Sequence, residues 1–225
     1  MSSIAEYRKV SNMMAAADYL VTLITGQLVI GKKVFWLVPG GSAINIAVEV
    51  SKQLQGLSLE NLTVTLTDER YGNIGHPDSN WTQLEKAGFT LPRANLQPVL
   101  TGQDLQSTVS GYARILQDNL AKADYAVGFF GIGADGHTAG ILPRTSAVGE
   151  TNFAYGYESD PYIRVTMTPS AIAGLDEAVV YAVGDSKWPV IDRLDDLVGL
   201  SQMPAQALKQ ARKLVVFNDF KGDNV

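Results

Sequence analysis

The stretch Tyr125-Ala-Val-Gly-Phe-Phe-Gly-Ile-Gly-Ala-Asp-Gly-His-Thr-Ala-Gly-Ile-Leu-Pro143 is the most informative part of this 225-residue chain. Its first six residues form an apolar run, which predicts a buried β-strand. The remainder holds four glycines, whose backbones are sterically open, together with Asp135 and His137. An Asp and a His on a glycine-rich strand exit are what a metal-free acid–base site at the carboxyl edge of a parallel sheet requires.

Two other interpretations fit this stretch less well. The spacing Gly131-x-Gly133-x-x-Gly136 matches the dinucleotide-binding fingerprint, but that fingerprint opens a helix, and here Gly140 and Pro143 interrupt it. A histidine that merely packs in the core would leave the Asp-Gly-His sequence of a glycine-rich loop unexplained. We therefore expect no nicotinamide, flavin or other cofactor.

Predicted strands and helices alternate along the whole chain. The strands are expected at residues 34–38, 63–67, 125–131, 163–167, 178–183 and 214–217. The helices are expected at about 11–29, from a cap at Ser42 to Leu54, at about 80–87, and after a cap at Asp104. Apolar strands separated by amphipathic helices predict an α/β fold with a mostly parallel sheet covered by helices on both faces, a Rossmann-like three-layer arrangement. No linker or repeat interrupts the pattern, so we expect a single domain over residues 1–225.

Composition excludes several classes of function. A net charge of −5 without any basic run argues against a nucleic-acid or anionic-membrane partner. The absence of cysteine excludes thiol catalysis and fits a reducing cytoplasm, and no signal peptide or membrane-spanning segment is recognisable. With only two histidines, His76 and His137, a zinc site would consist mostly of carboxylates, so we expect no metal. Composition does not predict an oligomeric state.

Further strand exits carry unusual chemistry. Pro39-Gly-Gly-Ser42 joins glycines to a helix start, which favours an anion but is a common turn. Asp68-Glu-Arg70 directly follows a predicted strand, although a solvated charge cluster would look the same. Arg164 within a β-run and Lys187 after the strand 178–183 add two cations, and an arginine in a buried strand needs a partner.

These pieces together resemble the 6-phosphogluconolactonase family, which shares a superfamily with glucosamine-6-phosphate deaminase. The motifs, in chain order, are Gly40-Gly-Ser42, Asp68-Glu-Arg70 with Asp78-Ser-Asn80, Gly131-x-Gly-x-Asp-Gly-His-Thr-Ala-x-x-x-Pro143, Arg164-Val-Thr-Met-Thr168 and Gly184-x-x-Lys187. The resemblance extends from Trp36 to the final strand. One departure is Pro39-Gly-Gly-Ser-Ala-Ile44, where Ser-Gly-Gly-Ser/Arg-Thr-Pro is commoner in the family.

The resemblance implies hydrolysis of 6-phospho-D-glucono-1,5-lactone to 6-phosphogluconate in the oxidative pentose phosphate pathway, with this phosphorylated sugar lactone as the partner. His137 is the implied base that activates water, because an imidazole with a pKa near 6.5 suits that task at neutral pH. The other implied catalytic residues are Asp135, which orients His137, Asp68, which positions water or hydroxyls, and Arg70. The implied phosphate- and substrate-binding residues are Gly40, Gly41, Ser42, Asn80, Arg164 and Lys187. For Asn80, structural support of the loop is the equal alternative to substrate contact. His76 is expected at the surface, with a place in the pocket as the alternative.

Two other functions remain open from the sequence. A sugar-phosphate isomerase or deaminase would use the same phosphate cradle with Asp68 as the base. In the deaminase a glutamate follows the motif histidine by five residues, and here that position is Leu142, which cannot transfer protons. A non-catalytic sugar-phosphate sensor is the second possibility, but no DNA-binding appendage or basic helix accompanies the motifs.

Overall fold

The larger sheet of the protein is entirely parallel and lies at the centre of the molecule. The computed structural model describes residues 4–225. The strand order of the larger sheet is β11-β1-β10-β9-β6-β2-β3-β5, and every neighbouring pair of strands runs parallel. The strands are β1 (Ala5–Lys9), β2 (Val34–Val38), β3 (Leu62–Leu66), β5 (Asn95–Leu96), β6 (Tyr125–Phe130), β9 (Glu177–Ala182), β10 (Lys213–Asn218) and β11 (Asp223–Asn224). The predicted α/β class with a mostly parallel sheet is confirmed.

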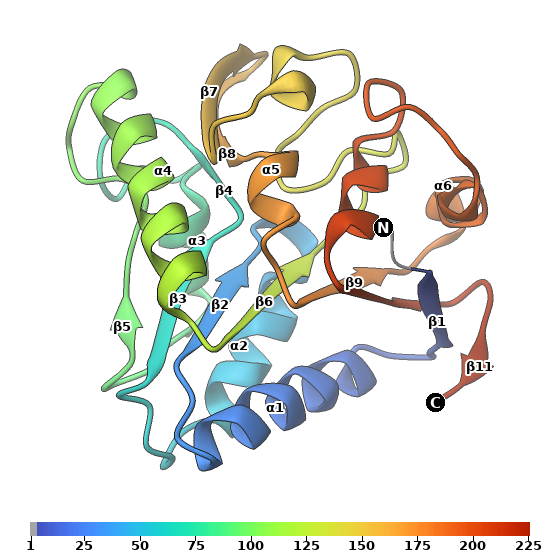
Figure 1. Ribbon diagram of the computed structural model, residues 1–225, viewed down its shortest axis with the longest axis horizontal. Coiled ribbons are helices and arrows are strands. Elements are labelled where there is room, and N and C mark those ends of the chain that lie inside the picture. Colours follow the sequence, from blue (N-terminus) through green and yellow to red (C-terminus); the bar gives the residue numbers. More distant parts are fainter. Residues whose placement is uncertain (1–3) are drawn as a thin grey trace.

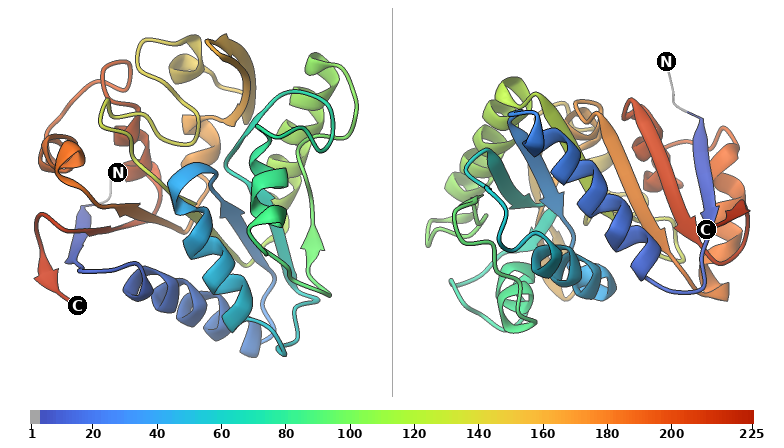
Figure 2. Two further views of the ribbon diagram at one scale, coloured as in Figure 1. Left: turned by 180° about the vertical axis from the view of Figure 1, so that it is seen from behind. Right: turned by 90° about the horizontal axis from the view of Figure 1, so that it is seen from below.

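Helices cover both faces of this sheet, as Figures 1 and 2 show. The helices are α1 (Met14–Val29), α2 (Ile44–Gln53), α3 (Asn80–Lys86), α4 (Leu105–Lys122), α5 (Pro169–Ile172) and α6 (Trp188–Asp192). Helices α1 and α2 pack against each other on one side, whereas α4 and α5 lie on the other. Because both faces are covered, every residue of β2 is buried, which explains why this strand is an unbroken apolar run.

A second, antiparallel sheet is the main difference from the sequence prediction. It has the order β4-β8-β7, formed by β4 (Asp68–Arg70), β8 (Tyr162–Met167) and β7 (Ala154–Ser159). Residues 68–70 are therefore a strand rather than a loop after one, and the run 163–167 belongs to this sheet rather than to the parallel one. Local apolarity predicts that a strand exists, but the partner to which it bonds depends on the path of the whole chain.

The start of α2 also differs from the prediction. Ser42 does not cap the helix, because a 3-10 turn over Gly41–Ala43 comes first and no side chain caps α2. The other predicted cap is confirmed: the carboxylate of Asp104 accepts a hydrogen bond of 2.9 Å from the backbone N–H of Ser107. Ser42 therefore lies inside the 3-10 turn that leads directly into α2.

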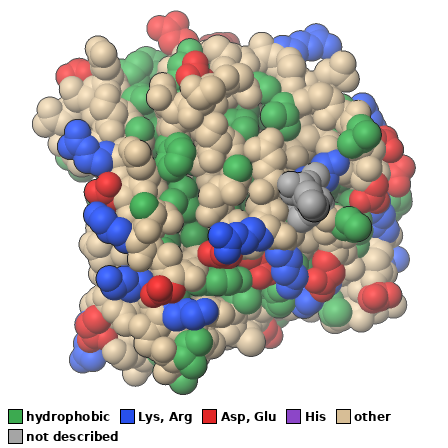
Figure 3. Space-filling view, in the orientation of Figure 1, with side chains coloured by type: hydrophobic (Ala, Val, Ile, Leu, Met, Phe, Trp, Pro, Cys, Tyr) green, Lys and Arg blue, Asp and Glu red, His purple; other side chains and the backbone are tan. Residues whose placement is uncertain are grey.

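The connections define where a ligand can bind. From β2 the chain continues to β3 and β5 on one side, whereas β6, β9 and β10 follow on the other. Such a change of direction opens a crevice outside the carboxyl ends of the strands, here between β2 and β6. On the face drawn in Figure 3, basic and acidic side chains are interspersed and do not gather into a patch of one sign. Among residues 4–225, no helix is both long and apolar enough to cross a bilayer.

Candidate active site

A cavity of about 410 Å³ lies at this switch point. It is bounded by the segments that follow β2, β3, β6 and β9, four neighbouring strands of the parallel sheet, together with the second sheet. Its lining residues are 39–43, Asp68, Arg70, Asn80, 131–133, His137, Ala139, Gly140, Arg164 and Lys187. The structure thus brings together at one cavity nine of the ten residues expected from the sequence, and the tenth, Asp135, contacts His137 from the side.

The loop after β6 holds His137 through close backbone packing. Gly133 N–H donates to the carbonyl of His137 at 2.9 Å, which folds the loop back on itself. A Cβ at position 133 would lie 2.2 Å from Nδ1 of His137, so only glycine allows the imidazole to occupy this place. The glycine-rich sequence therefore creates space for the histidine against the backbone.

Asp135 and His137 form a hydrogen-bonded pair. Nδ1 of His137 lies 2.6 Å from Oδ1 of Asp135, and the backbone N–H of His137 donates to the same oxygen at 3.1 Å. Partial burial opposes ionisation of Asp135, but the bonds and charge of His137 outweigh it, so the pKa of Asp135 is lowered. With Nδ1–H donated to a carboxylate, the lone pair of the imidazole is on Nε2, which has no partner among residues 4–225.

Asp68 faces the cavity from β4 in a buried environment. Asp68 is only 8% exposed. Burial raises the pKa of its carboxyl group despite the opposing effects of Arg164, the Thr67 hydroxyl and Arg70. Gly140 packs directly on this carboxyl group: a Cβ there would lie 2.8 Å from Oδ2 of Asp68, and φ is +71°. The loop that carries His137 is thereby brought against the second sheet.

Three cations line the same cavity. Arg70 and Arg164 come from neighbouring strands of the second sheet, and Lys187 ends the 3-10 turn Asp185–Lys187 after β9. Partial burial lowers the pKa of Lys187, an effect that the nearby Asp219 opposes. Nε of Arg70 is buried without a hydrogen-bond partner in the described part of the chain. Three cations around a small cavity suit a dianion such as a phosphate ester.

The turn after β2 and Asn80 complete the cavity wall. Gly41 has a φ of +66° and is the first residue of the 3-10 turn Gly41–Ala43. Ser42 of this turn lines the cavity. Nδ2 of Asn80 donates to the backbone oxygen of Asp68 at 2.9 Å, while its Oδ1 is buried without a partner within residues 4–225. Asn80 therefore holds β4 at the cavity wall, and its Oδ1 packs against Gly40 in the turn after β2.

Two residues of the site neighbourhood were missed from the sequence. Glu69 is fully buried and accepts hydrogen bonds from the Ser79 hydroxyl and from the backbone N–H groups of Arg70, Asn80 and Trp81. The hydroxyl of Tyr157 donates to the carbonyl of Gly140 at 2.6 Å. Glu69 belongs to the Asp68-Glu-Arg70 motif, and this motif is the signal that could have indicated it. No local sequence pattern indicates Tyr157.

His76 and Leu142 lie outside the cavity lining. His76 is half-buried, and its Nε2 lies 2.9 Å from the backbone oxygen of Arg70, so it is neither in the pocket nor at the open surface. Leu142 lines a neighbouring hollow of about 570 Å³ together with Asp135, Arg144 and Arg193. Leu142 and Asp135 therefore share a hollow that is separate from the cavity lined by His137.

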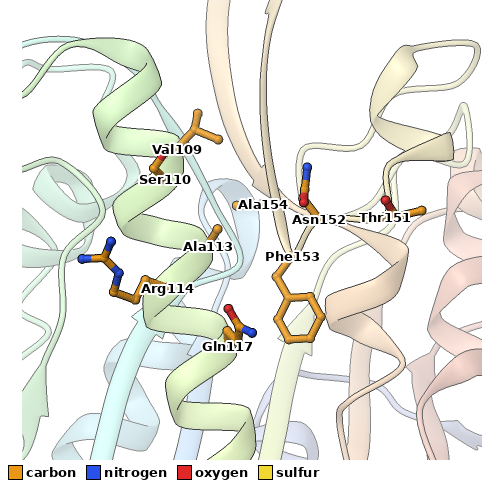
Figure 4. Close-up of a pocket in the computed structure, with 9 residues that line it drawn as sticks. All are labelled: Val109, Ser110, Ala113, Arg114, Gln117, Thr151, Asn152, Phe153 and Ala154. Atoms are coloured by element: carbon orange, nitrogen blue, oxygen red, sulfur yellow. The ribbon is translucent and has the colours of Figure 1, made fainter.

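A further hollow of about 530 Å³ lies between α4 and the segment that leads into β7, as Figure 4 shows. Arg114 is exposed there, and the remaining lining is made of neutral residues such as Gln117 and Asn152. Among the described residues this hollow has no histidine and no carboxylate in its wall. The smaller cavity at the switch point, with its acid–base pair, is thus the candidate active site.

Comparison with known proteins identifies the family to which the sequence is similar. Residues 8–217 match the family described as glucosamine-6-phosphate isomerases/6-phosphogluconolactonase. The 6-phosphogluconolactonase of Synechocystis is 33% identical over 147 residues, which are 59% of this chain and 60% of that protein. The enzyme of the same name from Streptomyces coelicolor is 26% identical over 89% of this chain and 85% of its own length.

Solved structures share the same fold. A 6-phosphogluconolactonase from Thermotoga maritima superimposes with a TM-score of 0.79 at 20% identity and covers 96% of this chain and 99% of its own. The 6-phosphogluconolactonase from Trypanosoma brucei gives a TM-score of 0.78 at 20% identity, over 96% of both chains. At this level of identity the likeness concerns the arrangement of the two sheets and their helices.

Proposed function

The chain belongs to the glucosamine-6-phosphate isomerase/6-phosphogluconolactonase family, and on this premise we propose that it hydrolyses 6-phospho-D-glucono-1,5-lactone to 6-phosphogluconate. The reaction belongs to the oxidative branch of the pentose phosphate pathway. The relatives that carry this activity in their names support the choice of substrate within the family. The chain spans 60% of the Synechocystis relative and 85% of the Streptomyces relative.

One observation carries the proposal: the 2.6 Å contact between Nδ1 of His137 and Asp135 beside a cavity lined by three cations. In the proposed arrangement Nδ1–H donates to Asp135, and Nε2 accepts a proton from water. Such a base contributes about 10²–10⁴-fold to a rate. A δ-lactone is an activated ester, so one activated water and a stabilised oxyanion are sufficient for its opening.

The proposed reaction proceeds in two steps. Water attacks the lactone carbonyl carbon while its proton passes to Nε2 of His137, and the carbonyl oxygen becomes an oxyanion. Collapse of this intermediate breaks the bond to the ring oxygen, which takes the proton back from the imidazolium. Asp135 stabilises the imidazolium between the two steps, and its lowered pKa supports a carboxylate at neutral pH.

The other lining residues bind and orient the substrate in this proposal. Arg164 and Lys187 hold the phosphate, Arg70 holds the phosphate or the developing oxyanion, and the turn at Gly40, Gly41 and Ser42 supplies backbone amides. Asp68 positions the water or a sugar hydroxyl. Asn80, which also lines the cavity, contacts the substrate or supports the loop.

We further propose that the enzyme needs no metal and works in the cytoplasm. Within residues 4–225, no group of three or more His, Asp or Glu side chains is arranged to hold a metal ion. The lack of cysteine in the sequence is compatible with a reducing compartment.

The decisive experiment couples purified protein to freshly generated lactone and follows acid release above the spontaneous rate, before and after exhaustive EDTA treatment. We expect catalysis in both samples. Acid release at the spontaneous rate contradicts the lactonase, and loss with EDTA followed by rescue with a divalent ion contradicts the metal-free mechanism.

A further inference from the structure

Two arginines of the candidate site stand directly opposite each other in the second sheet. The antiparallel pairing of β4 with β8 aligns Arg70 with Arg164. Both side chains therefore point to the same face, on which Asp68 and Thr166 also form an aligned pair. Like charges at directly opposed positions of an antiparallel pair destabilise a sheet. Something in the structure must keep the two guanidinium groups together.

The ring of Tyr162 lies against both groups. Tyr162 precedes Arg164 by two residues in β8, so it occupies the same face and is the diagonal neighbour of Arg70. Its ring centroid is 4.5 Å from Cζ of Arg70 and 5.6 Å from Cζ of Arg164. These distances are within the range in which a guanidinium is attracted to the electron-rich face of an aromatic ring. A single ring thus serves both cations.

Few other contacts restrain the two arginines. Nη1 of Arg70 donates to the backbone oxygen of Asp78 at 3.1 Å, and Nε of Arg164 donates to the Ser159 hydroxyl at 3.1 Å. In the part of the chain that the structure describes, neither arginine forms an ion pair with a carboxylate. The buried carboxyl group of Asp68, on the same face, acts on both arginines electrostatically but forms no direct ion pair with either. The ring of Tyr162 is neutral and holds the two cations without adding negative charge, which leaves both guanidinium groups able to bind an anion in the cavity.

We propose that Tyr162 is a positioning residue that sets Arg70 and Arg164 as a paired clamp for the phosphate group of the substrate. The inference deepens the proposed function and rests on it. The clamp selects the phosphorylated lactone over the unphosphorylated one, because two adjacent guanidinium groups match a dianion and offer nothing specific to a neutral sugar. The hydroxyl of Tyr162 has no hydrogen-bond partner among residues 4–225, so the ring carries the effect.

The test compares Tyr162→Leu with Tyr162→Phe, since phenylalanine keeps the aromatic face and leucine removes it. Calorimetric titration with 6-phosphogluconate, with gluconate in parallel, measures the phosphate contribution without depending on hydrolysis. We expect Tyr162→Leu to bind 6-phosphogluconate about tenfold more weakly than the wild type, and Tyr162→Phe to retain most of the wild-type affinity. In steady-state assays the loss with leucine should appear mainly in KM for the phosphorylated lactone.

Tyr71→Leu is the matched control. Tyr71 is also half-buried and follows Arg70 directly, so it lies on the other side of the backbone, where its hydroxyl bonds to the carbonyl of Gln103. We expect this variant to bind 6-phosphogluconate as the wild type does.

The possible outcomes are distinct. Unchanged 6-phosphogluconate binding in Tyr162→Leu, or equal losses in the leucine and phenylalanine variants, overturns the inference. No measurable binding to the wild-type protein overturns it as well. A wild-type protein that binds 6-phosphogluconate but does not open the lactone contradicts the proposed function, and the Tyr162 comparison then still decides whether the clamp exists.

Discussion

At the scale of single residues, His137 combines a short bond to Asp135 with an unpartnered Nε2 beside the cavity. We predict that His137→Ala lowers kcat about 10²–10⁴-fold with little change in KM, because the imidazole acts on water and contributes little to substrate binding. Steady-state kinetics on the phosphorylated lactone measure both constants. His76→Ala is the control, since this second histidine lies outside the lining.

Near-wild-type turnover in His137→Ala would remove this histidine from the role of base. An equal loss in His76→Ala would mean that removal of either imidazole disturbs the loop structure, and the two histidines would then not be distinguishable by rate alone. Circular dichroism of both variants checks that the secondary structure is intact.

Asp68 offers a prediction on stability. Its pKa is raised in the folded state because burial disfavours the carboxylate, so the ionised group costs stability above the folded pKa. This cost falls as the pH drops towards the unfolded value. We therefore expect Asp68→Asn to raise Tm by about 2–4 °C at pH 7 while it lowers activity. The gain should shrink at pH 4, and a variant less stable than wild type at pH 7 would contradict the expectation.

At the scale of secondary-structure elements, Glu69 joins β4 to the first turn of α3. Its buried carboxylate accepts four hydrogen bonds, three of them from the Ser79 hydroxyl and the N–H groups of Asn80 and Trp81. We predict that Glu69→Ala destabilises the protein by about 3–5 kcal/mol, because four donors lose a charged partner in a buried place. Urea unfolding of the variant measures this loss.

Glu69→Ala should also affect the site, because the backbone N–H groups of Arg70 and Asn80 both donate to the carboxylate that this variant removes. We expect KM for the lactone to rise in the molecules that still fold. Glu60→Ala, which removes an exposed glutamate before β3, is the control and should match wild type in both measurements. Wild-type stability of Glu69→Ala would show that water replaces the carboxylate at no cost.

At the scale of the whole molecule, both sheets contribute to one hydrophobic core. Residues of the second sheet such as Val165 and Met167 belong to the same buried cluster as those of β2 and β6. We propose that residues 1–225 form a single domain, and we predict one cooperative unfolding transition. Scanning calorimetry should give a calorimetric enthalpy equal to the van't Hoff value, whereas two resolved transitions would mean that the second sheet unfolds separately.

The whole site also predicts substrate choice within the family. Deamination of glucosamine 6-phosphate and isomerisation of a phosphoaldose move a proton between adjacent carbons and need a relay of several proton-transferring groups. Leu142 provides no such group at the position of the deaminase glutamate, and it lines a separate hollow with Asp135. We expect lactone hydrolysis and negligible ammonia or ketose formation when lactone, glucosamine 6-phosphate and ribose 5-phosphate are assayed side by side. Robust ammonia release without acceleration of lactone opening would reverse the choice.

The parts that were predictable from sequence are those with a local physical cause. The buried strands β2 and β6 were identified because their apolar runs are short and bounded by turn residues, and Asp104 because a cap acts three residues away. The candidate residues His137 and Lys187 follow strands of the parallel sheet, whose carboxyl ends meet at one edge. The candidates Asp68, Arg70 and Arg164 belong to motifs of the resembling family, and the structure places them in the second sheet. The short strands β5 and β11 have only two residues each and carry no comparable local pattern.

The sequence by itself determined the α/β class, the succession of its main elements and the chemical groups of the site. Only the tertiary structure decided that residues 68–70 and 162–167 pair in a second sheet, because strand pairing depends on which segments the chain brings side by side. That pairing sets Arg70 opposite Arg164 and places Tyr162 against both. The clamp arises from residues more than 90 positions apart in the sequence, and no local pattern could indicate it.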